Sequence, residues 1–238
     1  MTKRKLDTTR THQTYKTLSG RAATGVTTAL SVINKPALLN WAWECGRDGL
    51  DYRKVKDKAA SIGTLAHFMI ECHVKGETPD TSEFSQADID AATISFSRFL
   101  KFWQDGKFKI IKSEEQITAD AMPPFGGTLD IVAERGDGAV CLIDIKTSKG
   151  IYDEMLFQLA AYIHLWNFGE VLMVDGEPTP RAIPIRRIEH TYIVRIGKQK
   201  DDDGEIRQLG NLENHFMVFQ SALRLHWQLK DIKKGAGK

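Results

Sequence analysis

Hydrophobic positions in the first hundred residues recur at helical spacing. A short helix is predicted over residues 26–33, and Pro36 starts a second one. A long helix is predicted over residues 52–74, and another over residues 85–103, where apolar side chains recur every three or four positions. We expect Trp41 and Trp43, in the second helix, to be core residues. The first half of the chain is therefore predicted to be mainly helical.

The periodicity then changes to that of strands. Strands are predicted over residues 108–119, 127–134 and 139–147, and the segment Arg135-Gly136-Asp137-Gly138 has the composition of a turn. An amphipathic helix is predicted next, over residues 153–168, followed by a strand over residues 190–197. Residues 201–204 are predicted to form a hairpin turn into a polar partner strand, and the last helix is predicted over residues 212–231. This order predicts an α/β fold around a mixed sheet.

The elements divide the chain into an arm and one domain. Residues 1–21 are polar and basic, and we expect them to form a flexible N-terminal arm. Residues 22–238 are expected to form a single domain. Its parts are a helical region, a sheet core and a closing hairpin with a helix (22–105, 106–200 and 201–238).

Composition excludes several classes of protein. With 42% hydrophobic and 27% charged residues, the 238-residue chain resembles an ordinary globular protein, and its net charge of +2 says little about partners. No apolar run approaches the roughly 18 residues of a membrane helix, and no signal region follows the basic start. Three cysteines lie far apart (Cys45, Cys72 and Cys141), which argues against a zinc ribbon or an iron–sulfur cluster. We expect a cytoplasmic protein with no membrane association.

Two aspartates are predicted to face each other across the central hairpin. If Gly138 is left-handed, Arg135 pairs with Ala139, and counting back along both strands places Asp130 opposite Asp144. Opposed residues in an antiparallel pair have Cβ atoms roughly 4.5–5.5 Å apart, so two like charges there are destabilising. A divalent cation with oxygen ligands would remove that repulsion.

A lysine completes this polar cluster. Strand alternation places Lys146 on the same face as Asp144, while Ile143 and Ile145 face the other layer. Charges in such an apolar strand pair cost several kcal/mol unless they are paired or bind metal. The alternative is a simple buried ion pair, which leaves the second aspartate unexplained. The tripeptide alone is not specific, because Asp-x-Lys recurs at residues 105–107 and 231–233.

Four short motifs together resemble the RecB-like exonuclease branch of the PD-(D/E)XK nuclease superfamily. Asp130 matches the first acid, with Leu129 in place of the proline, and Asp144-Ile145-Lys146 matches the (D/E)XK element. Gln158-Leu159-Ala160-Ala161-Tyr162 matches the Gln-x-x-x-Tyr motif, and Gly63-Thr64-Leu65-Ala66-His67 matches the upstream Gly-x-x-x-His helix. The four cysteines typical of CRISPR-associated relatives are not present.

The resemblance implies a restriction-endonuclease-like fold, in which a mixed sheet is flanked by helices and preceded by a helical region. It also implies a DNA exonuclease dependent on Mg²⁺ or Mn²⁺, and a histidine nitrogen among oxygen ligands makes Mn²⁺ attractive. The implied metal ligands are His67, Asp130, Asp144 and the backbone carbonyl of Ile145. The implied catalytic residues are Asp130, Asp144, Lys146, Gln158 and Tyr162.

Several alternatives stay open at this point. Glu71 and Glu115 are further acids that could belong to the metal site or be ordinary surface glutamates. The substrate would be single- or double-stranded DNA with a free end, in recombination, repair or phage DNA processing. An endonuclease on the same core and a non-catalytic DNA-binding subunit are the rival functions. The sequence also leaves open a homo-oligomer or a recombination or repair partner protein.

Overall fold

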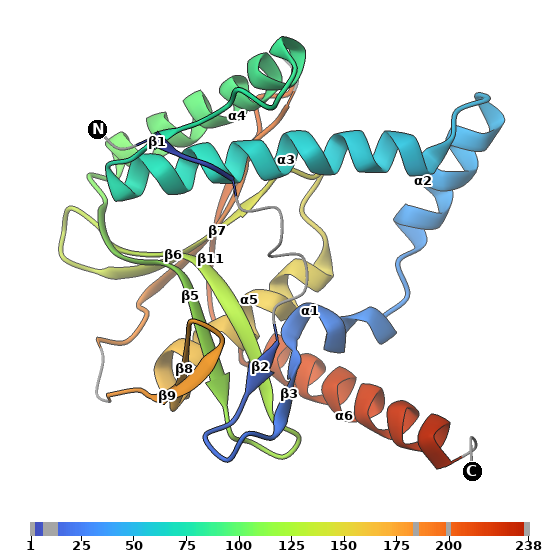
Figure 1. Cartoon of the computed structure of the whole chain (residues 1–238), viewed down its shortest axis with the longest axis vertical. Coiled ribbons are helices and arrows are strands. Elements are labelled where there is room, and N and C mark those ends of the chain that lie inside the picture. The colour runs from blue at the N-terminus through green and yellow to red at the C-terminus, as the bar shows by residue number, and fades with distance from the viewer. Residues whose placement is uncertain (1–2, 7–13, 183–185, 199–200, 236–238) are drawn as a thin grey trace.

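The computed structural model describes residues 3–6, 14–182, 186–198 and 201–235. A mixed sheet lies between two layers of helices: α3 and α4 cover one face, and α5 and α6 cover the other (Figure 1). The predicted α/β fold is therefore confirmed. Within the described residues, every helix is too short or too polar to span a lipid bilayer.

The strand order is β11-β10-β7-β6-β5-β8-β9. Along this order β10 is parallel to β7, whereas the other neighbouring strands are antiparallel. The bounds are Lys109–Ala119 (β5), Phe125–Glu134 (β6), Val140–Lys146 (β7), Val171–Val174 (β8), Glu177–Pro180 (β9), His190–Arg195 (β10) and Glu205–Leu209 (β11).

The predicted helices are present, with small differences at their ends. They are α1 (Val26–Ala29), which continues as a 3₁₀ turn, α2 (Pro36–Arg47), α3 (Tyr52–Lys75), α4 (Gln86–Asp105), α5 (Asp153–Phe168) and α6 (Glu213–Gly235). Local capping fixes α3, because the Asp51 carboxylate accepts a hydrogen bond from the Arg53 amide at 2.9 Å. At the other end of α3, Gly76 adopts the left-handed conformation with φ +70°.

Short strands that the hydrophobic pattern did not predict complete the fold. In the predicted N-terminal arm, β1 (Lys3–Arg4) pairs with β4 (Thr78–Pro79), and β2 (Tyr15–Lys16) pairs with β3 (Ala22–Gly25). These parts of the arm are thus held against the domain. The β8–β9 hairpin was also not predicted, although its turn carries the Asp175-Gly176 pair typical of two-residue hairpins, both at positive φ.

The central hairpin has the predicted turn and register. Gly138 has φ +90°, and the Arg135 amide donates to the Ala139 carbonyl at 2.9 Å. The strand pairs begin at Glu134 with Val140 and run to Ile131 with Ile143. Continuing that register by one position brings Asp130 opposite Asp144.

The prediction that the α2 tryptophans are core residues is wrong for Trp43. Its side chain is 65% exposed. Trp41 is half-buried and packs edge-on against Tyr52, with ring centroids 6.4 Å apart. The hydrophobic spacing of α2 is real, but this helix lies mostly outside the core.

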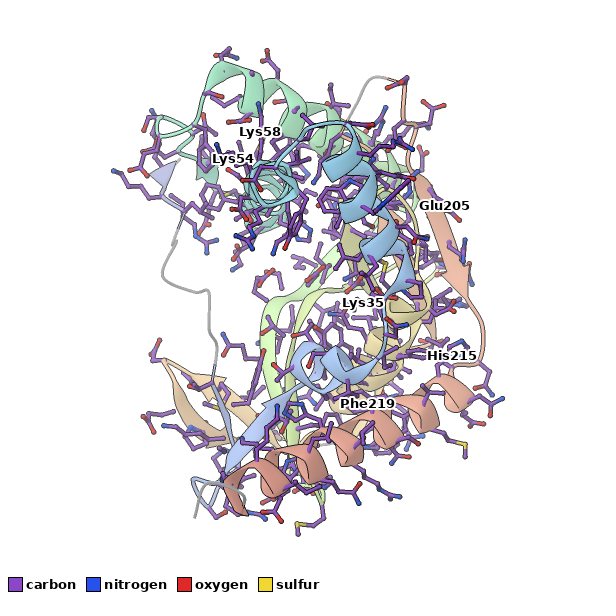
Figure 2. All side chains as sticks on the ribbon, turned by 90° about the vertical axis from the view of Figure 1, so that its right-hand side faces the viewer. Lys35, Lys54, Lys58, Glu205, His215 and Phe219 are labelled. Carbon is purple, nitrogen blue, oxygen red and sulfur yellow. The ribbon has the colours of Figure 1, made fainter. Side chains whose placement is uncertain are left out.

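Phe219 tests how far the α6 layer stabilises the sheet (Figure 2). It is fully buried and packs against Phe125, with ring centroids 5.0 Å apart. Phe219→Ala should lower the free energy of unfolding by about 3–5 kcal/mol because it leaves a cavity. Chemical denaturation monitored by circular dichroism would measure the loss. Met217→Ala on the same helix is the matched control, since Met217 is 63% exposed and should change stability by less than about 0.5 kcal/mol.

Candidate active site

The site lies at a fork in the sheet. One edge of β6 pairs with β5. The other edge pairs with β3 at Phe125 and Gly126, and with β7 only from Ile131 onward. Residues 127–130 therefore stand between two diverging partner strands, and Asp130 occupies the inner end of the fork.

Two glycines let tyrosine rings pack directly on the backbone of β6. A Cβ atom at Gly126 would lie 2.6 Å from Cγ of Tyr15, and one at Gly127 would lie 2.6 Å from Cε1 of Tyr162. Neither approach is compatible with a larger residue unless the ring moves. The glycines that precede Asp130 in the sequence thus position Tyr162 beside the fork.

The Asp130 side chain replaces a backbone partner where the strands separate. Its Oδ2 atom accepts a hydrogen bond from the Ile145 amide at 2.8 Å. The amide and carbonyl of one strand residue point to the same edge, so the Ile145 carbonyl also faces the fork. Asp130 is thereby fixed against β7.

Asp144 is the most deeply buried acid of the fork. It is 1% exposed, and its Oδ2 atom forms an ion pair with Lys146 Nζ at 2.6 Å. Its Oδ1 atom has no hydrogen-bond partner among the described residues. Ile143 and Ile145 pack in the α3–α4 core, so Asp144 points to the opposite face, as strand alternation predicts. A buried carboxylate oxygen without a partner is energetically costly.

Burial and neighbouring charges shift the pKa values of Asp144, Asp130 and Lys146. Burial, followed by repulsion from Asp130, raises the pKa of Asp144 to about 6, even though Lys146 opposes the shift. Burial also raises the pKa of Asp130, against the effects of Lys146 and the Ile145 amide. Burial would lower the pKa of Lys146, but the two carboxylates outweigh it and raise the pKa above its usual value. Two acids thus share one cationic side chain.

His67 on α3 places an uncharged imidazole near the acids and Lys146. Burial, followed by the charge of Lys146, lowers its pKa to about 4, so the imidazole is uncharged at neutral pH. Gly63, one turn earlier, allows α3 to approach the end of β7, because a Cβ atom there would lie 2.5 Å from Oγ1 of Thr147. The Gly-x-x-x-His spacing therefore has a structural reason in this fold.

Gln158 and Tyr162 meet on the sheet-facing side of α5. The Gln158 amide donates to the Tyr162 hydroxyl at 2.7 Å. Burial, reinforced by the charges of Asp144 and Asp130, raises the pKa of Tyr162 well above its usual value. The hydroxyl therefore stays protonated and can donate a hydrogen bond to an anion.

A cleft of about 420 Å³ opens between α3 and the sheet at this point. Asp130 and His67 lie in its wall. The other polar or small lining residues are Arg4, Ala60, Gly63, Thr64, Glu71, Glu114 and Thr147. The fork is thus connected to the surface.

The two additional acids considered from the sequence have different surroundings. Glu71 lines the cleft, but Arg4 and Lys75 bind its Oε1 atom at 2.8 and 2.6 Å. Glu115 lies opposite Leu129 on β6 and contacts Lys112 Nζ at 3.8 Å, and it is not among the cleft-lining residues.

Sequence reasoning missed two other charged groups near the site. Glu114 lines the cleft, and the β5–β6 register places it across from Asp130, where its backbone has φ +54°. Lys198, which follows β10, donates to the Ala59 carbonyl of α3 at 2.6 Å and helps to lower the pKa of His67. Strand register signals Glu114, whereas nothing local in the sequence signals Lys198.

The donor set fits a hard divalent cation, although it is not closed into a cage. No three His, Cys, Asp or Glu side chains among the described residues are already arranged to hold a metal ion. Even so, Asp144 has an unpartnered buried oxygen, the two acids carry more charge than Lys146 neutralises, and His67 is neutral. These are the properties that a cation would complement.

Comparison with known proteins gives little guidance. No family model and no curated protein matches the chain. Among solved structures, it is similar to one titled "Crystal structure of SSO0001", with 12% identity and a TM-score of 0.36 over 85% of this chain and 76% of that one. A likeness this weak carries no argument.

The charge imbalance predicts that Asp130→Asn stabilises the metal-free protein. Replacing one buried charge leaves the Asp144–Lys146 ion pair intact, and the asparagine oxygen can still accept from the Ile145 amide. In EDTA at pH 8, thermal or urea unfolding should show a gain on the order of 1–3 kcal/mol.

The pH dependence of this gain follows from the raised pKa values. A carboxyl group with a higher pKa in the folded state favours folding when protonated, and that contribution is lost as the pH rises through about 6, the pKa of Asp144. The advantage of Asp130→Asn should therefore be largest at pH 8 and shrink as the pH falls below about 6, where Asp144 becomes protonated and no longer repels Asp130. Asp57→Asn, at an exposed position of α3, is the control. An equal or lower stability of Asp130→Asn at pH 8 would contradict the charge imbalance.

Proposed function

We propose that this protein is a divalent-metal-dependent deoxyribonuclease that hydrolyses phosphodiester bonds, and that it acts as an exonuclease. The observation that carries the proposal is the fork itself. Asp130 and Asp144 converge there with a single lysine, and Asp130 and a neutral His67 line the cleft. The four motifs that resemble the RecB-like branch supply the charged residues of the fork, the histidine of α3 and the Gln/Tyr pair of α5.

The residues that would hold the cation are His67, Asp130, Asp144 and the Ile145 carbonyl. The carbonyl faces the fork because the Ile145 amide does so. When bound, Mg²⁺ or Mn²⁺ would neutralise charge on the scissile phosphate and lower the pKa of a water molecule.

Lys146 has the position and charge to act on the phosphate. Its pKa is raised by the two acids, so it remains an ammonium group at neutral pH. An ammonium fixed beside Asp144 can stabilise negative charge that develops on the phosphoryl oxygens or orient the attacking water. Tyr162, held by Gln158, supplies a hydroxyl that can donate to a phosphate oxygen.

The resemblance to an exonuclease branch favours cleavage from a DNA end over internal cleavage. The corresponding biological role would be recombination, repair or phage DNA processing. With Mg²⁺ or Mn²⁺, we expect linear end-labelled DNA to be degraded while covalently closed circular DNA of the same sequence persists. Gel analysis over time would measure this difference. Cleavage of the closed circle at a comparable rate would indicate an endonuclease instead.

The sequence offers a matched test of the catalytic tripeptide, because Asp-Ile-Lys occurs twice. Asp144→Ala and Lys146→Ala should each reduce cleavage of linear DNA by at least about 1,000-fold, since they remove a ligand and the ammonium group. Asp231→Ala and Lys233→Ala alter the identical tripeptide at the exposed end of α6 and should leave cleavage unchanged. Initial rates with folded proteins, verified by circular dichroism, provide the comparison.

Two results would count against the proposal. Full activity in Asp144→Ala or Lys146→Ala would remove the mechanism. If the unmodified protein shows no hydrolysis of linear, single-stranded or flapped DNA with Mn²⁺, a non-catalytic DNA-binding subunit becomes the better description.

A further inference from the structure

Helix α2 presents an apolar surface that the rest of the described chain does not cover. Of its 12 residues only Cys45 is buried. Leu38, Leu39 and Trp43 are 51%, 67% and 65% exposed. A helix of this length gains most of its stability from packing, so an uncovered apolar face is unusual. Exposed patches of this kind mark interaction sites.

The helix belongs to a hairpin at one side of the molecule. Figure 1 shows α2 and the beginning of α3 extending beyond the sheet, and Figure 2 looks onto this side. Trp41 of α2 packs edge-on against Tyr52, the first residue of α3. The α2–α3 hairpin, residues 36–58, is thus a projecting element with an aromatic tip.

Basic side chains surround the beginning of α3. Residues 53–58 contain Arg53, Lys54, Lys56 and Lys58 against one acid, Asp57, so four positive charges and one negative give +3. The three lysines are exposed and form no ion pair with another described residue. Figure 2 shows Lys54 and Lys58 at this end of the helix.

Arginines also accompany the exposed rings. The Arg47 guanidinium lies 5.3 Å from the ring centroid of Trp43, and that of Arg53 lies 5.8 Å from the ring of Tyr52. Aromatic faces beside arginine and lysine are the combination with which proteins bind single-stranded nucleic acid, through base stacking and phosphate contacts.

Helix α3 connects this hairpin to the cleft. Ala60, Gly63 and His67 line the cleft, and Lys56 lies one turn before Ala60 on the same side of the helix. Tyr52 is 15 residues before His67, which corresponds to about 22 Å along the axis. At the roughly 3.4 Å per nucleotide of a fully stacked strand, about six nucleotides span that distance, and a more extended single strand spans it with fewer.

We propose that the α2–α3 hairpin binds the single-stranded segment of a DNA substrate whose end enters the cleft. Lys56, on the side of α3 that leads to the cleft, contacts a phosphate, and Trp43 stacks on a base. A duplex does not present base faces to such a ring, whereas a single strand does. The positive charge of residues 53–58 favours a polyanion over an apolar protein partner. This inference rests on the proposed function for what happens in the cleft, but the binding itself is separable from cleavage.

The first experiment measures binding in EDTA, where no hydrolysis occurs. Fluorescence anisotropy with labelled oligo-dT of 12 nucleotides should show that Trp43→Ala weakens binding about 5- to 100-fold, with partial recovery in Trp43→Phe. A thymidine dinucleotide is too short to reach from the cleft to the hairpin and should bind both proteins equally. Phe168→Ala is the matched control, because Phe168 is 48% exposed and lies beneath Arg187 in the same way, at the end of α5.

The second experiment measures the salt dependence of the same binding. Replacing Lys56 with alanine should reduce the slope of log K against log salt by about 0.7, which is the contribution of one phosphate contact on a single strand. Replacing Lys233 of α6 with alanine removes the same charge elsewhere and should leave the slope unchanged.

The outcomes separate this inference from the proposed function. Unchanged affinity for the 12-mer in Trp43→Ala, or an equal loss in Phe168→Ala, overturns the inference even if the protein is an active nuclease. A change in sedimentation from oligomer to monomer in Trp43→Ala, with DNA binding unaffected, also overturns it and assigns the hairpin to self-association. Hairpin-dependent binding by a protein that never cleaves DNA supports the inference and removes the proposed function.

Discussion

Two buried carboxylates that share one lysine are the constraint on which the site depends. Asp144 is sealed from solvent and has one oxygen without a partner, and Asp130 lies across from it where β6 and β7 separate. Burial raises both pKa values, and repulsion from Asp130 adds to the shift of Asp144, so the folded chain retains an interaction that opposes its own stability. Such local conflict inside an otherwise well-packed sheet is characteristic of functional sites. Among these three groups negative charge exceeds positive charge, and the proposed divalent cation would remove that imbalance.

The surrounding fold makes this arrangement tolerable. The Ile145 amide donates to Asp130 instead of to the backbone of β6, so this amide keeps a partner where the fork opens. Gly126 and Gly127 admit the rings of Tyr15 and Tyr162 against the strand, and both faces of the sheet beyond the fork are covered by apolar layers. The cost of the acids is therefore confined to a few residues, while the sheet and its helices supply the stability of the domain.

Local chemistry made the central hairpin predictable. A glycine at φ +90° in the Arg135-Gly136-Asp137-Gly138 turn fixes the register, and the register fixes which acids face each other. Long-range packing was not predictable in the same way. Helical spacing in α2 shows that one face is apolar but not whether another element covers it, so Trp43 was placed in the core and is in fact exposed. Glu115 was considered although Glu114 lines the cleft, because a strand pattern identifies alternate positions but not which face meets a helix.

Helix α3 connects the proposed metal site with the proposed DNA-binding hairpin. One part of the helix carries His67 at the cleft, and its beginning carries the lysines of the hairpin, about 22 Å away on a rigid element. A DNA strand bound at the hairpin would be bound with the same free energy in the ground state and in the transition state, because the hairpin is too far from the cleft to contact the breaking phosphodiester bond. Contacts of this kind stabilise the bound substrate and the transition state alike, so they act on KM rather than on kcat. In the proposed mechanism the charge of Lys146 would instead act on kcat, since its stabilising effect grows as negative charge develops on the phosphate in the transition state. In these proposals the beginning of α3 would contribute to DNA binding, and the part that carries His67 would contribute to catalysis.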